Sequence, residues 1–456
     1  MDHSKQLGEG KVLGLLFKFS IPAIVGMLVN ALYNIVDRIF IGNGIGSLGI
    51  AGITIAFPIM LFIMACGMLI GIGANSLISI RLGQGKKEAA ELIMGNAMVM
   101  LIGISLIITA AGLVFLEPLL KAFGASPAVM PYAMGYTQII LLGTVFQSIG
   151  FGMNNFIRAG GRPGVAMFTM LIGALLNTVL DPLFIFVFHW GIQGAALATI
   201  ISQLVSAIWI LYHFIGGKSI LRIYLKNLKL NLDTVKGIVL IGSAPFAMQI
   251  AASLLNVIMN RTLFFYGGDI AISGMGIVNS VLVLFLMPIF GINQGVQPII
   301  GYNYGAKKYD RVKEALKLGI IGATLIVLTG FIVTQFFSHE IVALFNQKDV
   351  ELIAFGSRAI KIFLLFLPII GFQIVSANYF QAVGKPKQAA FLSLSRQVLI
   401  LIPAILILPR FFGLDGALMA GPVADLLSSI ITGIVITMEL KNLGKQHELT
   451  LDSGQL

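Results

Sequence analysis

The chain has 456 residues, of which 57% are hydrophobic and only 11% are charged. Soluble globular proteins carry about 25% charged residues, and the mean hydropathy of +0.96 points the same way. This composition excludes a soluble enzyme and a disordered chain. The apolar runs are continuous and do not alternate with polar residues, which excludes a transmembrane β-barrel. The sequence therefore predicts an all-α polytopic membrane protein.

Twelve apolar runs are each long enough to cross a bilayer as a helix, which takes about 20 residues. In the first half of the chain these spans are predicted at 15–39, 49–80, 92–116, 135–157, 164–188 and 193–215. In the second half they are predicted at 236–263, 270–300, 316–337, 358–380, 388–410 and 414–438. The first run lacks a small-residue cleavage site, so we expect it to remain as the first helix.

The basic residues alternate along the connections between these spans. Most of the 30 Lys and Arg lie near the two ends or in every second connection, for example Lys86 and Lys87 after the second span. The positive-inside rule then predicts that both termini are cytoplasmic. We expect a multi-pass protein of the inner (plasma) membrane, in contact with lipid, and no nucleic-acid partner despite the net charge of +11. The single cysteine, Cys66, lies in an apolar run and is expected to pack there without a disulfide.

The two halves of the chain repeat each other. RAGGRPGVAMF at 158–168 matches QAVGKPKQAAF at 381–391, and Pro22 near the start of the first half matches Pro245 in the second. Each half holds six predicted helices and therefore has the same orientation. Such parallel repeats place substrate sites at their interface. We predict three parts: an amino-terminal lobe at 1–220, a cytoplasmic linker at 221–235 and a carboxy-terminal lobe at 236–456.

Ionisable side chains within the spans are candidates for function because they are costly to bury in lipid. Asp37 lies in the first span and Asp181 in the fifth, and Asn177 shares a helix face with Asp181 at a spacing of four. Thr199 in the sixth span lies at a similar depth. We predict that these four residues form a site for H⁺ or Na⁺, since both suit carboxylate and hydroxyl oxygens. The alternative is structural: Asp37 pairs with its neighbour Arg38, and Asp181 caps a kink.

The repeat supplies an internal control for this site. The residues that correspond to Asn177 and Asp181 in the second half are Ile400 and Ala404, so the acidic cluster belongs to one lobe only. Asp425 in the last span has a basic residue, Arg396, at a reachable depth, and we expect a structural ion pair there.

Other polar residues of the first lobe are candidates for a central substrate cleft: Asn30, Tyr33, Asn34, Gln147 and Asn154. Pro22 shares a helix with Asp37 and removes a backbone hydrogen bond, so we expect a bend there that responds to cation binding. We expect no cofactor and no resident metal. GQGKK at 83–87 lacks the spacing of a phosphate loop, and no nucleophile–base set is visible.

Several segments resemble the multidrug and toxic compound extrusion (MATE) family. They are DRIFIG at 37–42, RLGQG at 81–85, AGGRP at 159–163 and NTVLDPLFIF at 177–186. The resemblance covers the whole chain and implies a V-shaped transporter of two lobes that exports organic cations against an inward flow of H⁺ or Na⁺. It is nearest to the bacterial DinF-like and MepA-like branch. In DinF-like members, an Asp of helix 1, an Asn-x-x-x-Asp pair of helix 5 and a Thr of helix 6 bind the cation, which implies the same four residues here.

The resemblance also sets the partners and the rival functions. It implies small amphipathic organic cations as substrates, and we expect a monomer. One alternative is a flippase for lipid-linked precursors of the same superfamily. A channel is a second alternative, although an acidic pair in one lobe is not a symmetric pore ring. An enzyme is not expected.

Overall fold

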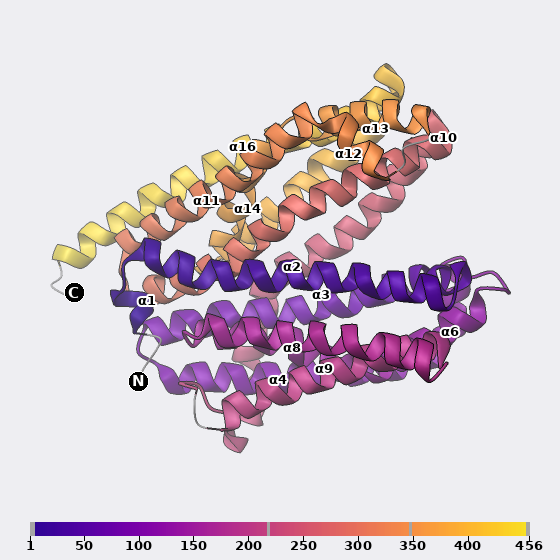
Figure 1. Ribbon diagram of the computed structural model, residues 1–456. Coiled ribbons are helices and arrows are strands. Elements are labelled where there is room, and N and C mark those ends of the chain that lie inside the picture. Colours follow the sequence, from indigo (N-terminus) through magenta and orange to yellow (C-terminus); the bar gives the residue numbers. More distant parts are fainter. Residues whose placement is uncertain (1–4, 217–218, 346–348, 453–456) are drawn as a thin grey trace. The chain divides into compact units, whose positions relative to one another are not determined.

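The computed structural model describes residues 5–216, 219–345 and 349–452. Every regular element in these ranges is a helix, and no strand occurs among them (Figure 1). The predicted all-α class is therefore confirmed. Backbone N–H and C=O groups have no water to bond to in lipid, so long apolar segments satisfy them as helices.

The helices of the first half follow the predicted spans closely. They are α1 (Gln6–Glu9), α2 (Val12–Gly44), α3 (Ser47–Gly83), α4 (Lys87–Val114), α5 (Leu116–Ala122), α6 (Met130–Leu142), α7 (Thr144–Ala159), α8 (Pro163–Pro182), the π-helix η1 (Leu183–Val187) and α9 (Gly191–Ile215). The fourth predicted span, 135–157, consists of α6 and α7, which meet at an angle of 55°.

The second half contains longer continuous helices. They are the 3-10 helix η2 (Leu225–Leu228), α10 (Leu232–Gly305), α11 (Tyr309–Phe336), α12 (Ser338–Phe345), α13 (Val350–Phe363), α14 (Leu367–Ala382), α15 (Pro386–Leu394), the π-helix η3 (Ser395–Leu401) and α16 (Ile402–Asp452). Two of them are broken by a glycine with positive φ, Gly268 in α10 and Gly413 in α16. A residue without Cβ adopts this conformation at no steric cost.

The number of membrane spans follows from these breaks. Within the described ranges, nine helices are long and apolar enough to cross a membrane, or up to eleven if each bent pair is one span. The last of them, Pro386–Gly444, is 59 residues long, far more than one crossing needs. Its division at Gly413 yields the twelve predicted spans. The chain is thus a multi-pass membrane protein.

The chain forms two compact units whose boundaries fall inside helices. Unit 1 consists of Met1–Gly10 and Ile21–Phe246, and unit 2 consists of Lys11–Ser20 and Ala247–Leu456. The first nine residues of α2 therefore belong to unit 2, while the beginning of α10 belongs to unit 1. The two boundaries lie next to Pro22 and Pro245, the prolines that the sequence repeat pairs.

Glycines allow the beginning of α10 in unit 1, and the beginning of α2 in unit 2, to pack very closely against neighbouring helices of the same unit. In unit 1, a Cβ on Gly242 of α10 would lie 1.7 Å from the carbonyl oxygen of Leu69 in α3. A Cβ on Gly73 of α3 would lie 2.2 Å from the carbonyl oxygen of Ile238. Small residues at helix crossings let membrane helices pack backbone against backbone. These two glycines therefore fix the beginning of α10 against α3.

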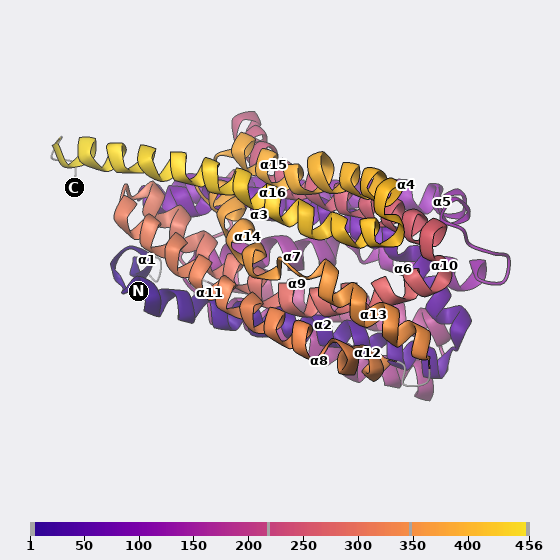
Figure 2. The same cartoon turned by 90° about the horizontal axis from the view of Figure 1, so that it is seen from above.

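Unit 2 contains a similar close contact, in which a glycine of the second half meets the first helix of the first half. A Cβ on Gly295 of α10 would lie 2.4 Å from the hydroxyl oxygen of Ser20 in α2 and 2.7 Å from its backbone nitrogen. The first helix of each half thus begins against a glycine of the other half. Elsewhere in unit 2, α14 packs against α11 and α16, and η3 packs against α16 (Figure 2).

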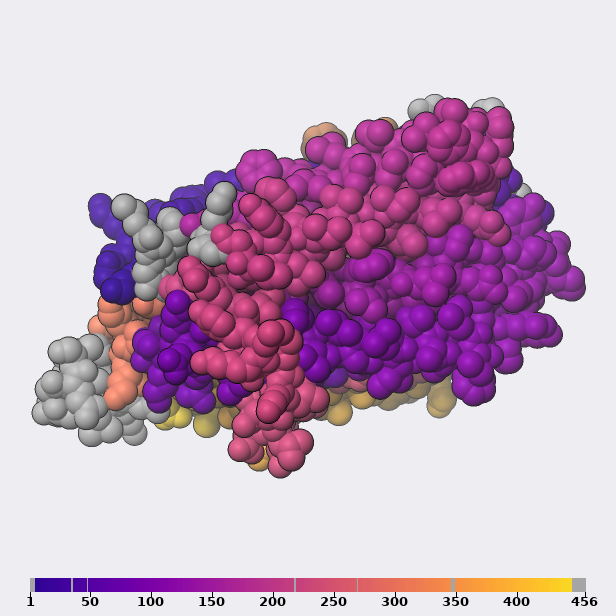
Figure 3. Space-filling model, turned by 90° about the horizontal axis from the view of Figure 1, so that it is seen from below, coloured from indigo at the N-terminus to yellow at the C-terminus, as the bar shows by residue number. Residues whose placement is uncertain are grey.

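The segment after α9 is fastened to the first turns of α4 within unit 1. The side-chain amide of Asn96 donates to the carbonyl oxygens of Asn227 and Lys229, both at 3.1 Å, and its oxygen accepts from the backbone N–H of Asn231 at 2.7 Å. Gly95 gives the linker room, since a Cβ there would lie 2.5 Å from Asn227 O. In Figure 3 this segment crosses one end of α4 as a ridge.

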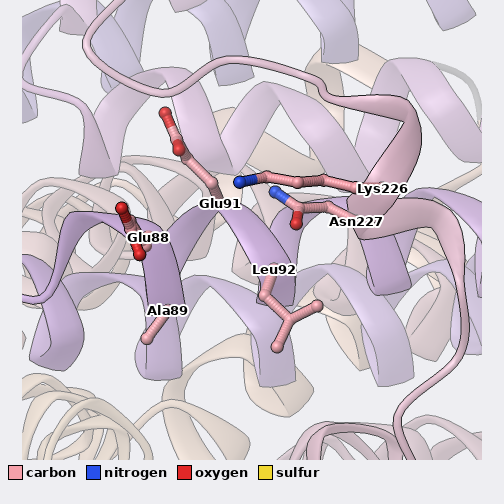
Figure 4. Close-up of a pocket in the computed structure, with 6 residues that line it drawn as sticks. All are labelled: Glu88, Ala89, Glu91, Leu92, Lys226 and Asn227. Carbon is pink, nitrogen blue, oxygen red and sulfur yellow. The ribbon is translucent and has the colours of Figure 1, made fainter.

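A surface hollow lies beside this attachment. Figure 4 shows Lys226 and Asn227 of the linker facing side chains of α4, and the lining residues are Glu88, Ala89, Glu91, Leu92, Lys226 and Asn227. Glu91 is buried and accepts from the backbone N–H of Arg222 at 3.2 Å. Glu91 therefore helps to hold the linker in place.

Candidate cation site

Asp37 of α2 and Asp181 of α8 come together in unit 1 because two glycines let α2 approach the fifth span. A Cβ on Gly26 of α2 would lie 2.6 Å from the sulfur of Met170 in α8. Further along, a Cβ on Gly44 would lie 2.3 Å from the side chain of Ile185 in η1. Between these two contacts, the carboxyl groups of Asp37 and Asp181 lie next to each other, close enough for one to donate a hydrogen bond to the other when it is protonated.

Side chains from α8 and α9 complete the cluster. The amide nitrogen of Asn177 donates to Asp181 Oδ1 at 3.2 Å and to the hydroxyl oxygen of Thr199 at 3.4 Å. The Thr199 hydroxyl itself donates to the carbonyl oxygen of Ala195 at 3.1 Å. The structure thus brings together all four residues that the sequence proposed, Asp37, Asn177, Asp181 and Thr199.

These four side chains are buried, and three of their oxygens have no hydrogen-bond partner. Asp181 is fully buried, and the exposed fractions are 2% for Asn177, 7% for Thr199 and 8% for Asp37. The unpartnered atoms are Asp37 Oδ1, Asn177 Oδ1 and Asp181 Oδ2. A buried polar group without a partner costs about 1–3 kcal/mol. Three such acceptors in one cluster leave a place for a proton or a small hard cation.

The donor set suits H⁺ or Na⁺ better than a transition metal. All the available atoms are carboxylate, amide or hydroxyl oxygens, which are hard ligands. In the described part of the chain, no group of three or more His, Cys, Asp or Glu side chains is placed to hold a metal ion.

Tyr136 of α6 is a neighbour of the cluster that the sequence did not reveal. Its side chain is only 2% exposed and lies close enough to Asp37, Asp181 and Tyr33 to interact electrostatically with each of them. It also packs with Ile41 in the apolar cluster that surrounds this end of unit 1. Nothing in the sequence places Tyr136 near the cluster, because its depth and the direction of its side chain depend on the bend between α6 and α7.

Arg38 does not form the ion pair with Asp37 that the structural alternative requires. Its side chain is exposed, and its guanidinium carbon lies 6.0 Å from the ring centre of Phe57 in α3. Consecutive residues on a helix point in different directions, so the Arg38 guanidinium acts on the buried carboxyl group electrostatically without ion-pair contact. Asp181 does stand directly before Pro182, where the regular α-helix ends and the π-helix η1 begins. Pro182 has no N–H to donate, which explains this change of helix type.

The five residues proposed for a substrate cleft have different environments. Asn30 is exposed on α2, and Tyr33 and Gln147 are partly buried. Asn154 is buried, and its amide nitrogen donates to the carbonyl oxygen of Ala166 in α8 at 2.9 Å. The side chain of Asn34 lies outside the described part of the chain. Tyr33 is near Tyr136, which borders the acidic cluster.

Pro22 lies within a helix that stays continuous from Val12 to Gly44. Its missing N–H removes one hydrogen bond from the ladder at the point where α2 passes from one unit to the other. A weakened ladder at this boundary is consistent with a bend, although α2 keeps helical geometry here.

The second unit carries a different arrangement. Arg396 Nε donates to Asp425 Oδ1 at 2.6 Å, and this ion pair was expected from the sequence. The Asp425 side chain is only 3% exposed, against 23% for Arg396. The positions that correspond to the acidic cluster of unit 1 hold the apolar residues Ile400 and Ala404. Among the residues that the structure describes, the unpaired acidic cluster thus belongs to unit 1 alone.

Two repeated six-span units with buried polar residues define the class of a polytopic transporter. The chain belongs to the MatE family: the family model matches residues 22–183 and again residues 245–407. The two matches begin at Pro22 and Pro245, the pair found in the internal repeat. Proteins of this family are transporters, so the chain is a transporter and not an enzyme.

The comparisons with individual proteins agree with this assignment. The chain is 27% identical over 448 residues to the multidrug export protein MepA of Staphylococcus aureus, which covers 98% of this chain and 97% of that protein. Its fold is similar to that of a MOP superfamily transporter from Pyrococcus furiosus, with a TM-score of 0.91, 24% identity and coverage of 96% and 98%. An outward-facing multidrug resistance MATE family transporter gives the same values. The small-molecule substrates that multidrug export implies agree with the expected kind of partner.

Proposed function

We propose that this transporter is a secondary active exporter of amphipathic organic cations, driven by an inward flow of H⁺ or Na⁺. The observation that carries the proposal is the buried cluster of Asp37, Asn177, Asp181 and Thr199, with three oxygens that lack partners. The second repeat has no such cluster, so the fold does not require it. A costly polar group that the fold does not need is a candidate for function.

The cluster supports coupling because the inward cation and the exported organic cation would compete for binding within the same lobe. A proton or Na⁺ that enters from outside satisfies Asp37 and Asp181 and neutralises charge that is otherwise buried. Movement of α2 about Pro22 then changes the substrate cleft, and the organic cation leaves. Each ligand must bind the two states with different affinity, because a ligand of equal affinity shifts no equilibrium.

The proposed orientation places both termini in the cytoplasm of a cell whose inner membrane holds the protein. It rests on the basic residues that gather in every second connection. In this orientation the acidic cluster lies in the outer half of unit 1, where a cation from outside reaches it first.

The test is transport in proteoliposomes of wild type and Asp181→Asn, with efflux of a cationic dye such as ethidium as the readout. A pH gradient and a Na⁺ gradient are imposed separately. Asn keeps the size of the side chain but holds neither a titratable proton nor a formal charge. We expect one gradient to drive wild type, and Asp181→Asn to lose that coupling. Asp233→Asn, an exposed change at the start of α10, is the matched control and should transport normally.

Two results would contradict the proposal. Coupled efflux by a folded Asp181→Asn variant would show that the site is misplaced. If neither gradient drives dye efflux by wild type, the proposed export of organic cations is wrong. A lipid-linked precursor is then the next substrate to assay.

A further inference from the structure

The two repeats contain the same turn between their fourth and fifth spans. In unit 1, the N–H of Gly161 donates to the carbonyl oxygen of Arg158 at 2.9 Å, and that of Arg162 donates to Ile157 at 3.2 Å. In unit 2, the N–H of Gly384 donates to Gln381 at 3.1 Å, and that of Lys385 to Phe380 at 2.8 Å. Gly161 and Gly384 both have positive φ, 82° and 73°. The turns are therefore comparable residue by residue, with Arg162 in the place of Lys385.

In unit 2 the basic residue of this turn is neutralised by the protein. Lys385 Nζ lies 2.6 and 2.7 Å from the two carboxylate oxygens of Glu439 in α16. The Tyr379 hydroxyl donates to the same carboxylate at 3.1 Å. Glu439 is only 6% exposed and Tyr379 is fully buried. The cation and the anion thus form a closed, satisfied group at this end of unit 2.

In unit 1 the corresponding carboxylate is missing while the positive charge is doubled. The sequence match that aligns Gly191 with Gly413 places Gly217 opposite Glu439. Arg158 stands where the second repeat has Gln381. No carboxylate lies within ion-pair distance of Arg158 or Arg162 among residues 5–216, 219–345 and 349–452.

Arg158 is the unusual member of this group because it is buried. It is 4% exposed, and its Nη2 donates to Asn155 Oδ1 at 2.9 Å, a neutral acceptor. Arg158 stands in the last turn of α7, where the helix end carries partial negative charge, but no carboxylate among the described residues balances its full charge. His213 of α9, also buried, is a neighbour of Arg162 and brings no negative charge.

The backbone at this point also favours an anion. The 20-residue helix α8 begins at Pro163, directly after Arg162. The first N–H groups of a helix have no partner within the helix and carry partial positive charge. The turn joins the end of one span to the start of the next, which is expected near a membrane surface. Residues 158–161 and 163 are buried, so the partly exposed Arg162 is the part of the turn that a lipid headgroup can reach. Arginine forms paired hydrogen bonds to phosphate oxygens.

We infer that the turn at 158–163 of unit 1 is a binding site for a phosphate group, in which the ligand takes the place that Glu439 holds in unit 2. The phosphate of an anionic phospholipid headgroup and free phosphate share this chemistry. The site is separate from the acidic cluster and does not depend on the transport proposal.

The experiment measures the apparent unfolding temperature of the purified full-length protein in phosphate-free alkyl maltoside. One arm compares sodium phosphate with sodium chloride at equal ionic strength. The other compares dioleoyl phosphatidylglycerol with dioleoylglycerol, which has the same chains and no phosphate. We expect stabilisation of wild type in at least one arm. We expect Arg158→Gln, which copies the residue of the second repeat, to need about tenfold more ligand or more for half of the effect.

A matched change controls for general charge, and a second variant covers misfolding. Arg81→Gln removes a positive charge elsewhere in unit 1 and should respond as wild type does. If Arg158→Gln does not fold, Arg162→Gln, at a partly exposed position, should show the same loss of response. Stabilisation by phosphatidylglycerol alone identifies a lipid site, and stabilisation in both arms identifies a general phosphate site. An unresponsive wild type, or an Arg158→Gln that responds equally, overturns the inference.

Discussion

Gly242→Ala should destabilise the protein, because this glycine lies where α10 crosses α3 in unit 1. The added Cβ would lie 1.7 Å from Leu69 O, 2.6 Å from its carbonyl carbon and 2.9 Å from its Cα. All three are backbone atoms, so no side-chain rotation relieves the clash. Ordinary contact begins at 3.4 Å, so the two helices must move apart.

The size of the effect follows from two opposing contributions. Alanine is favoured over glycine in a helix interior by about 0.5–1 kcal/mol. Forcing an extra methyl group into a packed crossing costs about 1–3 kcal/mol, and more where the backbone has to shift. Because backbone shifts at Gly242, we expect a net loss of roughly 2 kcal/mol.

Gly276 in the same helix is the matched control. An added Cβ there would meet no atom within 4 Å, so Gly276→Ala keeps only the favourable helix contribution. Thermal unfolding of both variants in one detergent and at one scan rate should therefore give shifts of opposite sign relative to wild type. If Gly242→Ala is as stable as Gly276→Ala, the close crossing of α3 and α10 is wrong.

Three further predictions concern polar contacts. Asp425→Asn should lower the free energy of unfolding by about 3 kcal/mol, since it leaves the charge of Arg396 unpaired. The double variant Asp425→Asn/Arg396→Gln should regain most of this loss. If the losses of the two single variants add instead, the ion pair is contradicted. Asn96→Ala removes the hydrogen bonds that hold the linker to α4, so limited proteolysis within 219–231 should become faster. An unchanged rate of cleavage would contradict that attachment. Tyr379→Phe removes one hydrogen bond to Glu439, which keeps its ion pair with Lys385, so thermal unfolding should show a loss of about 1 kcal/mol. A much larger loss would contradict this arrangement.

The sequence was sufficient for the class, the spans and the repeat. Long apolar runs must be helical in lipid whatever their neighbours are, so the spans can be read one at a time. The pairing of Asn177 with Asp181 is equally local, because residues four apart on a helix share a face. The match between Pro22 and Pro245 needed only the comparison of the two halves.

Contacts between helices could not be predicted in this way. The sequence does not show that Tyr136 borders the acidic cluster or that Arg38 turns to Phe57. Nor does it show that Arg158, unlike Lys385 beside Glu439, has no carboxylate partner in the described ranges. Each depends on how bends and glycines set the distance and rotation between distant segments. The exchange of the first part of α2 and of α10 between the units has the same origin. Local hydropathy determines that a helix forms, whereas side-chain packing across the fold decides which face of it meets which neighbour.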